Sequence, residues 1–281
     1  MMTTVSNVME TNLFTISKNE SISKAQILMR ENRIGCLPVM NEDKQLVGII
    51  TTWDAMMSDP GDIVADVMTA PVICIEPATS IWEAKEIMEE NNIERLLVLE
   101  GEKLAGLVTK TRLFSEVAKH YDILTKLNKI DYLIYQGSRL LKKGIEISII
   151  FMDLDGFGDI DKKYGHMFGD SILRELGDLL TESVPKCCYV CRYAGDEFAV
   201  LTPYDKGKCK ELAVKLLKTI SMQVYGADKV SVSASAGIAG TRCSPGRPYQ
   251  DYAGHMRELL NLASLASTKA KRSGKPLETV D

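Results

Sequence analysis

The sequence has no excess of basic residues. Its 34 lysines and arginines are outnumbered by 38 aspartates and glutamates, and the formal net charge is −4. A protein that holds nucleic acid through its phosphates needs a positive surface field, and this composition supplies no global one. We therefore expect no nucleic-acid partner, although local lysine clusters can still meet phosphate groups.

Regularly spaced cysteines and long apolar runs are also missing. The seven cysteines form an odd set, and the only cluster, Cys187, Cys188 and Cys191, lacks the second pair that a zinc site needs. We interpret the cluster as small apolar strand residues. No stretch approaches a membrane span, and no charged segment followed by an apolar run opens the chain. These absences predict a reduced, cytoplasmic protein without membrane association.

The first half of the chain contains an internal repeat. Val8-Met9 recurs as Val67-Met68, and the run Gly-Ile-Ile-Thr at 48–51 recurs as Gly-Leu-Val-Thr at 106–109. Two units of about sixty residues therefore follow each other. The sequence of each unit predicts one helix with apolar residues at helical spacing, followed by two short strands joined by a polar turn.

This repeat resembles a tandem CBS domain, or Bateman module, which we expect over residues 1–112 with repeats at about 8–54 and 67–112. The resemblance implies an adenine nucleotide, with the Thr51 hydroxyl toward phosphate and the Asp54 carboxylate on the ribose hydroxyls. In the second repeat Arg112 replaces that aspartate, so the ribose acceptor is lost there. The alternative is a dimerisation module whose clefts are empty.

A helical pattern follows the repeat. Leu113, Val117, Tyr121, Leu124 and Leu127 recur at spacings of one helical turn, and neither glycine nor proline occurs between Leu113 and Gln136. We predict a continuous helical connector over 113–130 that enters a second domain at 131–281. Its role is either to pack on its own domain or to transmit dimer geometry.

Two acidic turns characterise the second half. Strand-like residues flank the turn that carries Asp196 and Glu197, which is typical of a hairpin. A continuous apolar strand over 147–152 ends at Asp153. A carboxylate at a strand end beside an acidic hairpin suits Mg²⁺, which takes one or two carboxylates and leaves its other positions to phosphates and water.

The run Ala194-Gly195-Asp196-Glu197-Phe198 resembles the signature of the GGDEF family, the diguanylate cyclases. Further motifs follow in the family's order: Asp122-Ile123-Leu124-Thr125, the segment 153–170, the strand 235–239, and Ala270-Lys271 with Gly274-Lys275. The resemblance implies an α+β fold with a palm-like, nucleotidyl-cyclase-type antiparallel sheet. It also implies a homodimer in which two GTP molecules become cyclic di-GMP and pyrophosphate.

The resemblance assigns a role to each matching residue. Metal binding falls to Asp153, the Leu154 carbonyl and Asp196, which would hold Mg²⁺ or Mn²⁺ on the phosphates. The catalytic pair is Asp196, which helps to deprotonate the 3′-hydroxyl, and Glu197, which supports the metal. Asp161 and Asp170 are implied to contact the guanine base. Lys271 and Lys275 are implied to contact the triphosphate. Both lysines also suit a helix C-terminus, and His166 is interpreted as a turn residue.

Several departures from the family pattern favour an alternative, a catalytically silent GTP-binding or scaffold domain. Gly158 stands where a lysine usually reaches the phosphates. Asp161 stands where an asparagine usually contacts guanine, and aspartate accepts but cannot donate. Ala194 replaces the first glycine of the signature. The family's product-inhibition motif would fall on residues 185–188 and is absent, so we expect no feedback at that position.

Overall fold

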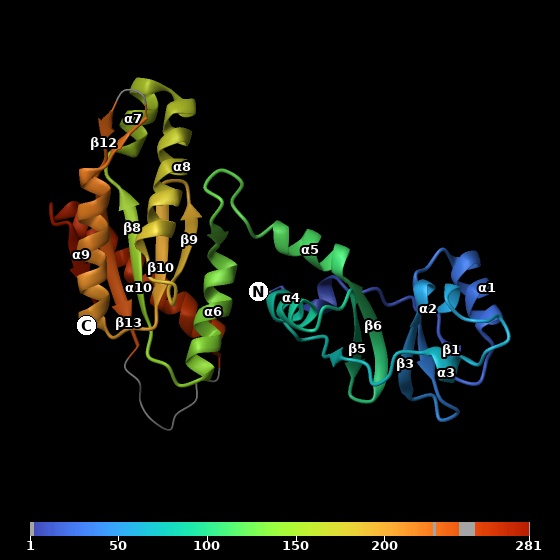
Figure 1. Ribbon diagram of the computed structural model, residues 1–281. Coiled ribbons are helices and arrows are strands. Elements are labelled where there is room, and N and C mark those ends of the chain that lie inside the picture. The colour runs from blue at the N-terminus through green and yellow to red at the C-terminus, as the bar shows by residue number, and fades with distance from the viewer. Residues whose placement is uncertain (1–2, 227–228, 242–250, 281) are drawn as a thin grey trace. The chain divides into compact units, whose positions relative to one another are not determined.

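The computed structural model describes residues 3–226, 229–241 and 251–280. The chain forms two compact units, Thr3–Ala118 and the residues from Lys119 onward. Each is described by itself (Figure 1). In the described residues, no helix combines the length and the apolar character that crossing a membrane requires.

Unit 1 contains two similar three-stranded sheets, ordered β1-β2-β3 and β4-β5-β6, in which the first pair is parallel and the second antiparallel. The predicted strand pairs and helices are present in both repeats. Its elements are η1 (Val5–Asn7), β1 (Ile16–Ser17), α1 (Ile22–Asn32), β2 (Cys36–Met40), β3 (Leu46–Thr51), α2 (Thr52–Met56), α3 (Val64–Val67), β4 (Cys74–Ile75), α4 (Ile81–Glu90), β5 (Arg95–Glu100), β6 (Lys103–Thr109) and α5 (Lys110–Ala118).

The two repeats exchange their leading segments. Glu10 pairs with Leu107 of the second repeat, whereas Thr69 pairs with Ile49 of the first. Each glycine of the repeated strand run is covered by the methionine that precedes the other repeat. A Cβ at Gly106 would lie 2.7 Å from the Met9 sulfur, and one at Gly48 would collide with Met68. The recurring Val-Met pairs therefore close the sheet of the opposite repeat.

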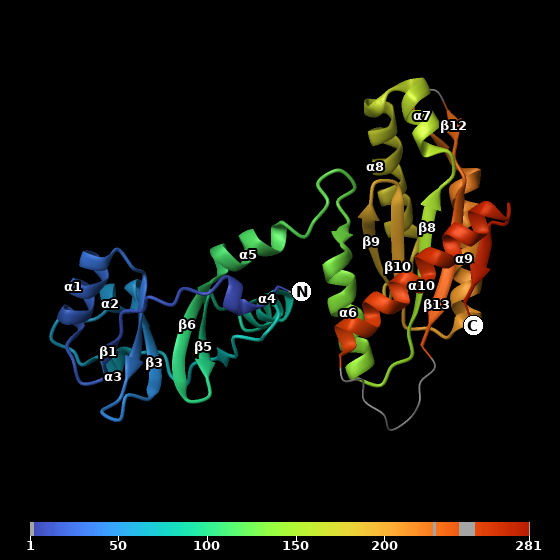
Figure 2. The same cartoon turned by 180° about the vertical axis from the view of Figure 1, so that it is seen from behind.

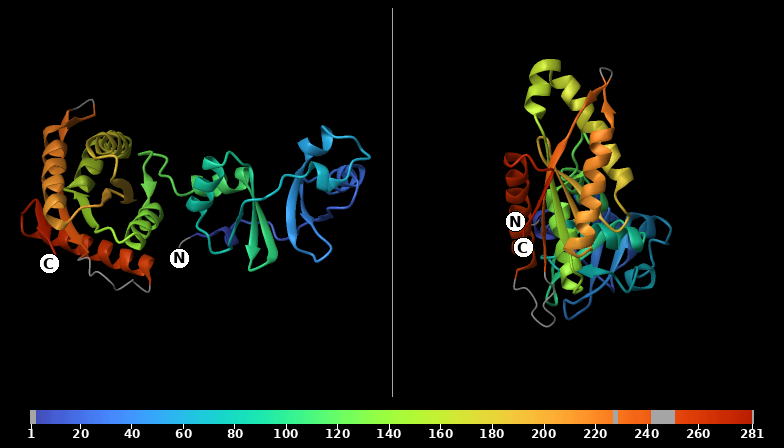
Figure 3. Two further views of the ribbon diagram at one scale, coloured as in Figure 1. Left: turned by 60° about the horizontal axis from the view of Figure 1, so that its bottom comes forward. Right: turned by 90° about the vertical axis from the view of Figure 1, so that its left-hand side faces the viewer.

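Unit 2 is built on a six-stranded sheet ordered β14-β13-β8-β10-β9-β7. Helices α8 and α9 cover one face, and α6 and α10 cover the other (Figures 1, 2 and 3). Its elements are β7 (Asn128–Lys129), α6 (Ile130–Lys142), β8 (Ser148–Leu154), α7 (Phe157–Tyr164), α8 (His166–Ser183), β9 (Tyr189–Ala194), β10 (Glu197–Thr202), α9 (Lys206–Met222), β11 (Val224–Tyr225), β12 (Val230–Ser231), β13 (Ala234–Gly240), α10 (Tyr252–Arg272) and β14 (Leu277–Thr279).

The central strand β8 is buried on both faces, as its uninterrupted apolar run predicts. Ile150, Met152 and Leu154 belong to the core under α8 and α9, whereas Ile149 and Phe151 belong to the core under α6 and α10. Because side chains alternate along a strand, Asp153 falls on the α10 side. The α+β fold with a mainly antiparallel sheet is thereby confirmed.

The prediction of a continuous helical connector is wrong. Helix α5 ends at Ala118, and α6 begins only at Ile130. The carboxylate of Asp122 accepts hydrogen bonds from the Thr125 amide and hydroxyl, at 2.9 and 2.8 Å. Such a local side-chain bond stabilises a turn instead of a helix. Lys126, with a φ of 57°, completes the reversal.

Candidate functional site

Three carboxylates predicted to act together converge at one end of the unit 2 sheet. Gly195 and Asp196 form the two-residue turn between β9 and β10, and Gly195 takes a φ of 49°. Glu197 is paired across the β10–β8 ladder with Asp153. The Leu154 amide donates to the Asp196 carbonyl oxygen over 3.4 Å. The sheet register thus brings together Asp153, Leu154, Asp196 and Glu197.

A lysine from the end of α10 enters the same cluster. The Lys271 ammonium donates to Asp153 Oδ1 at 2.6 Å and to the Leu154 carbonyl oxygen at 2.9 Å. Lys275 instead pairs with Glu278 at 3.0 Å, and 63% of its side chain is exposed. The structure therefore places Lys271, but not Lys275, on the predicted metal ligands.

The environment disfavours negative charge on the hairpin. Burial first, and then the nearby Asp153 and Asp161 carboxylates, raise the pKa of Asp196 above its ordinary value against the opposing effect of Lys271. Burial and the charges of Asp153 and Asp196 likewise raise the pKa of Glu197. Crowded carboxylates with raised pKa values are typical of functional sites.

The donor set fits a hard divalent cation. In the described residues, no group of three or more histidine, cysteine or acidic side chains is arranged to hold a metal by itself. Two carboxylates and one carbonyl are nevertheless what Mg²⁺ takes from a protein when phosphates and water supply its remaining ligands. The mutual repulsion of Asp153 and Asp196 is what a cation between them would relieve.

Asp161 lies at the junction of α7 and α8, next to the segment that carries Asp170. Its Oδ2 is 3.0 Å from His166 Nδ1, whereas its Oδ1 is buried and has no hydrogen-bond partner among the described residues. A Cβ at Gly169 would collide with that Oδ1, so glycine leaves the space it needs. Asp170, the next residue, is half-buried in α8. Because this oxygen is buried, an external donor reaches it only when the junction moves.

An arginine to which our sequence analysis assigned no role holds the acidic hairpin in place. Arg192 donates to the Gly195 carbonyl oxygen through Nε at 2.9 Å and through Nη2 at 2.7 Å. Its Nη1 lies 2.9 Å from Asp122 Oδ1 in a largely buried ion pair. Burial raises the pKa of Asp122, but the Thr125 and Arg192 hydrogen bonds outweigh it and leave that pKa below the ordinary value.

Arg192→Gln is expected to lower turnover about tenfold, because a loosened hairpin misplaces Asp196. Arg192→Lys should not rescue it, since lysine cannot make the planar, bidentate contact. Asp122→Asn acts through the same pair, so the double variant should be little worse than Arg192→Gln alone. Steady-state kinetics of the wild type and the four variants test this. Additive losses would show that the two residues act separately.

Asp155, the other carboxylate of the upstream acidic turn, is occupied structurally. It accepts hydrogen bonds from the hydroxyls of Ser233 and Ser235, at 2.7 and 2.8 Å, and its amide donates to the Ser233 carbonyl oxygen. These bonds tie the turn after β8 to the start of β13. Asp155 therefore holds the loop in place and leaves Asp153 as the carboxylate that faces the cluster.

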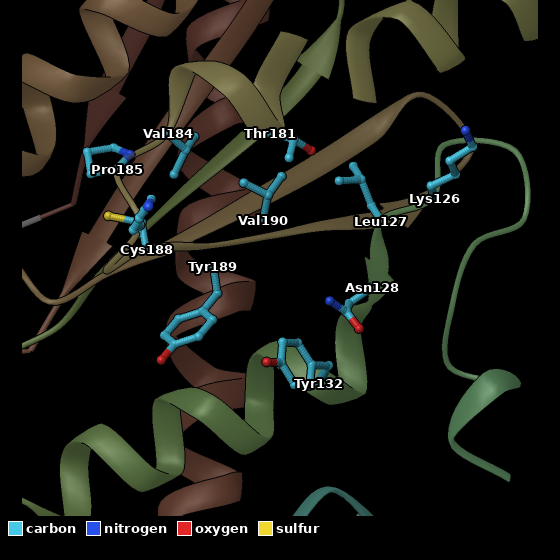
Figure 4. Close-up of a pocket in the computed structure, with 11 residues that line it drawn as sticks. Lys126, Leu127, Asn128, Tyr132, Thr181, Val184, Pro185, Cys188, Tyr189 and Val190 are labelled. Atoms are coloured by element: carbon cyan, nitrogen blue, oxygen red, sulfur yellow. The ribbon is translucent and has the colours of Figure 1, made fainter. Parts of the chain in front are cut away.

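A cavity of about 300 Å³ lies beside residues 185–188. This is the position at which the sequence lacks the family's product-inhibition motif. Tyr132 and Tyr189 stand edge to face on one side, with ring centroids 6.1 Å apart (Figure 4). Lys126 and Lys186 are the cations in its lining, which contains no arginine among the described residues. The lining therefore lacks the planar guanidinium that binds phosphate in a bidentate manner.

The nucleotide residues predicted in unit 1 make their polar contacts with each other. Asp54 Oδ2 accepts from the Thr51 amide and hydroxyl, both at 2.8 Å, and Thr51 Oγ1 accepts from the Asp54 amide. These bonds form a capping box at the start of α2. A cavity of about 300 Å³ in this unit is lined instead by Thr109 and Arg112 of the second repeat.

Comparisons with known proteins match both halves of the chain. The family model described as "Diguanylate cyclase, GGDEF domain" matches residues 119–276, and the CBS domain model matches residues 5–60 and 64–119. The first match covers more than half of the chain. It begins at the residue where unit 2 begins.

Individual relatives agree with this division. Diguanylate cyclase DosC of Escherichia coli is 30% identical over 61% of this chain and 38% of its own length. Inosine-5′-monophosphate dehydrogenase of Nitrosopumilus maritimus is 34% identical over 37% of this chain and 22% of its own. The GGDEF-domain structure of Pseudomonas aeruginosa PA1120 (TpbB or YfiN) covers 58% of this chain and 95% of that one, with 26% identity and a TM-score of 0.50. The chain thus spans less than half the length of these curated relatives.

Proposed function

The chain belongs to the GGDEF-domain family of diguanylate cyclases, and we propose that it condenses two molecules of GTP into cyclic di-GMP with release of pyrophosphate. The observation that carries this proposal is the convergence of Asp153, Asp196, Glu197 and Lys271 at one end of the sheet. The enzyme acts as a cytoplasmic homodimer, because one domain holds one GTP and supplies half of the reacting pair.

The chain's own residues divide the chemistry. Asp153, Asp196 and the Leu154 carbonyl would hold Mg²⁺ or Mn²⁺, and the charge of that ion would stabilise the transferring phosphoryl group. Asp196 would accept the proton of the 3′-hydroxyl from its position on the turn between β9 and β10. Glu197 supports the metal-binding carboxylates.

Substrate binding falls to two further groups. Asp161 and Asp170 accept hydrogen bonds from the N–H groups of guanine, which requires the junction of α7 and α8 to shift and uncover the buried, unpaired Oδ1 of Asp161. Lys271 meets the triphosphate, and Lys275 contributes from the same end of α10. An adenine nucleotide in the CBS pair regulates the output.

A silent GTP-binding scaffold is the second candidate. It is favoured by Gly158, around which a Cβ would meet open space, so no side chain replaces the phosphate-contacting lysine. The Asp161 carboxylate favours it too, because it adds negative charge near Asp196.

The two candidates differ in turnover. Purified protein incubated with GTP and Mg²⁺ should form cyclic di-GMP, at a specific activity that rises with protein concentration until dimers saturate. Chromatography of the products across a protein dilution series measures both effects. Tight GTP binding without product at any concentration, with or without adenine nucleotide, would favour the scaffold. Full specific activity in a strictly monomeric species would contradict the dimer.

A further inference from the structure

A cavity of about 300 Å³ in unit 1 contains an arrangement of charges that the other repeat lacks. Its lining includes Glu10, Arg95, Thr109 and Arg112, together with the apolar side chains Phe14 and Leu107. The offset that aligns Val8 with Val67 aligns Glu10 with Thr69, and the offset that aligns Thr51 with Thr109 aligns Asp54 with Arg112. The Glu10–Arg112 pair therefore has no counterpart in the first repeat.

Backbone hydrogen bonds between Glu10 and Leu107 hold the Glu10 side chain near Arg112. The Glu10 amide donates to the Leu107 carbonyl oxygen at 2.8 Å, and its carbonyl accepts from the Leu107 amide at 3.0 Å. Glu10 Oε2 lies 3.1 Å from Arg112 Nη1, and Oε1 accepts from the Asn12 amide at 3.2 Å. Both charged side chains are about half exposed. An ion pair so exposed to water is weak and easily exchanged.

Arg95 provides a second guanidinium without such a partner. No carboxylate pairs with it in the described part of the chain. It lies against the Gly35 backbone, where a Cβ would come within 3.1 Å of its Nη2. It also faces the Cys36 thiol, whose pKa is raised by burial and lowered by this guanidinium. A half-buried arginine that has no carboxylate partner beside a cavity is a ready anion site.

We propose that this cavity binds a phosphorylated ligand and that Glu10 is its internal competitor. The phosphate pairs with Arg95 and takes the place of the Glu10 carboxylate on Arg112, while Glu10 keeps its bond to the Asn12 amide. Thr109 Oγ1, which accepts from the Arg112 amide at 3.4 Å, has a hydroxyl proton to donate to the ligand. Phe14 and Leu107 provide the apolar wall for a base. The inference rests on the proposed regulation of unit 1 by nucleotide.

Calorimetry on the full chain tests this with AMP, ATP, adenosine and pyrophosphate as probes. Glu10→Gln is expected to bind the phosphorylated probes about two- to fivefold more tightly, because the competing charge is gone. Arg112→Gln and Arg95→Gln should each weaken binding about tenfold or more. Glu102→Gln is the control, because Glu102 is exposed in the turn between β5 and β6 and does not line the cavity, and this variant should bind as the wild type does.

The gain in Glu10→Gln cannot come from misfolding, so it separates competition from a structural role. Unchanged or weaker binding in Glu10→Gln would overturn the proposal. So would adenosine binding as tightly as AMP, or absence of binding by every probe. Loss of binding in Asp54→Asn, with none in Arg95→Gln and Arg112→Gln, would overturn it too, because the ligand would then lie in the first repeat. Pyrophosphate binding as tightly as ATP would support anion exchange and identify an inorganic ligand. Because GTP turnover is not measured, a chain without cyclase activity leaves the test intact.

Discussion

Asp196→Asn is expected to lower the rate of cyclic di-GMP formation on the order of 10³-fold or more, because it removes both a metal carboxylate and the proposed proton acceptor. Asparagine has nearly the same shape, so the turn between β9 and β10 should persist. Asp178→Asn is a matched control, because Asp178 is exposed on α8 outside the carboxylate cluster. Single-turnover and steady-state assays with GTP and Mg²⁺ measure the loss. Near-normal rates in Asp196→Asn would show that the metal lies elsewhere.

The same variant should be more stable than the wild type at neutral pH. The pKa of Asp196 is raised in the folded protein, chiefly by burial and then by Asp153, so folding is favoured while the carboxyl is protonated and loses that contribution as pH rises through the folded pKa. Below the ordinary carboxyl pKa of about 3.9 both states are protonated, and the two proteins should unfold alike. Thermal unfolding from pH 4 to 8, without GTP or divalent ions, checks this. A lower melting temperature for Asp196→Asn at pH 8 would contradict it.

The sequence predicted those parts of the fold that depend on local patterns. The acidic hairpin follows from two apolar runs around a Gly-Asp turn, and the burial of β8 follows from its uninterrupted apolar residues. The repeat predicted two equivalent halves of unit 1. The exchange of their leading segments was not predictable from the Val-Met pairs, because the pattern identifies equivalent positions without showing which sheet each one joins.

The helical connector was predicted wrongly because side-chain hydrogen bonds interrupt the helical spacing of its apolar residues. Leu113, Val117 and Leu124 have helical spacing, but the bonds between Asp122 and Thr125 replace the helix by a turn. The ion pair of Asp122 with Arg192 joins residues 70 positions apart, and periodicity does not report such long-range contacts. Asp122 opens one of the motifs named above and Arg192 lies two residues before another, so the motifs were the available signal.

In unit 1 the sequence directed attention to the first repeat, because only that repeat keeps an aspartate at the ribose position. Asp54 has the chemistry to hold a ribose, yet its carboxylate caps α2. When Arg112 is compared with Asp54 alone, the substitution only removes a hydrogen-bond acceptor for a ribose. Once Arg95 and Glu10 are seen to line the same cavity, Arg112 becomes part of a charged group with its own binding chemistry.

Lys271→Met is expected to lower kcat/KM for GTP by about 10- to 100-fold, the effect of losing a charge-assisted contact to the substrate. In the structure the ammonium lies on Asp153 Oδ1 and the Leu154 carbonyl oxygen, the same oxygens proposed to hold the metal. Two cations repel each other there, so the ammonium must turn toward the triphosphate when the metal binds. Methionine keeps the length of the side chain without its charge, and the Mg²⁺ concentration for half-maximal activity should therefore fall.

Less efficient use of GTP together with a lower Mg²⁺ requirement distinguishes Lys271 from a lysine that merely suits the C-terminus of α10. Lys269→Met is the matched control, because Lys269 is an exposed residue of the same last turn, and it should change neither quantity. Initial rates measured over a grid of GTP and Mg²⁺ concentrations give both numbers for each protein. If Lys271→Met leaves kcat/KM for GTP unchanged, or raises the Mg²⁺ requirement, the lysine supports Asp153 structurally and does not reach the phosphates.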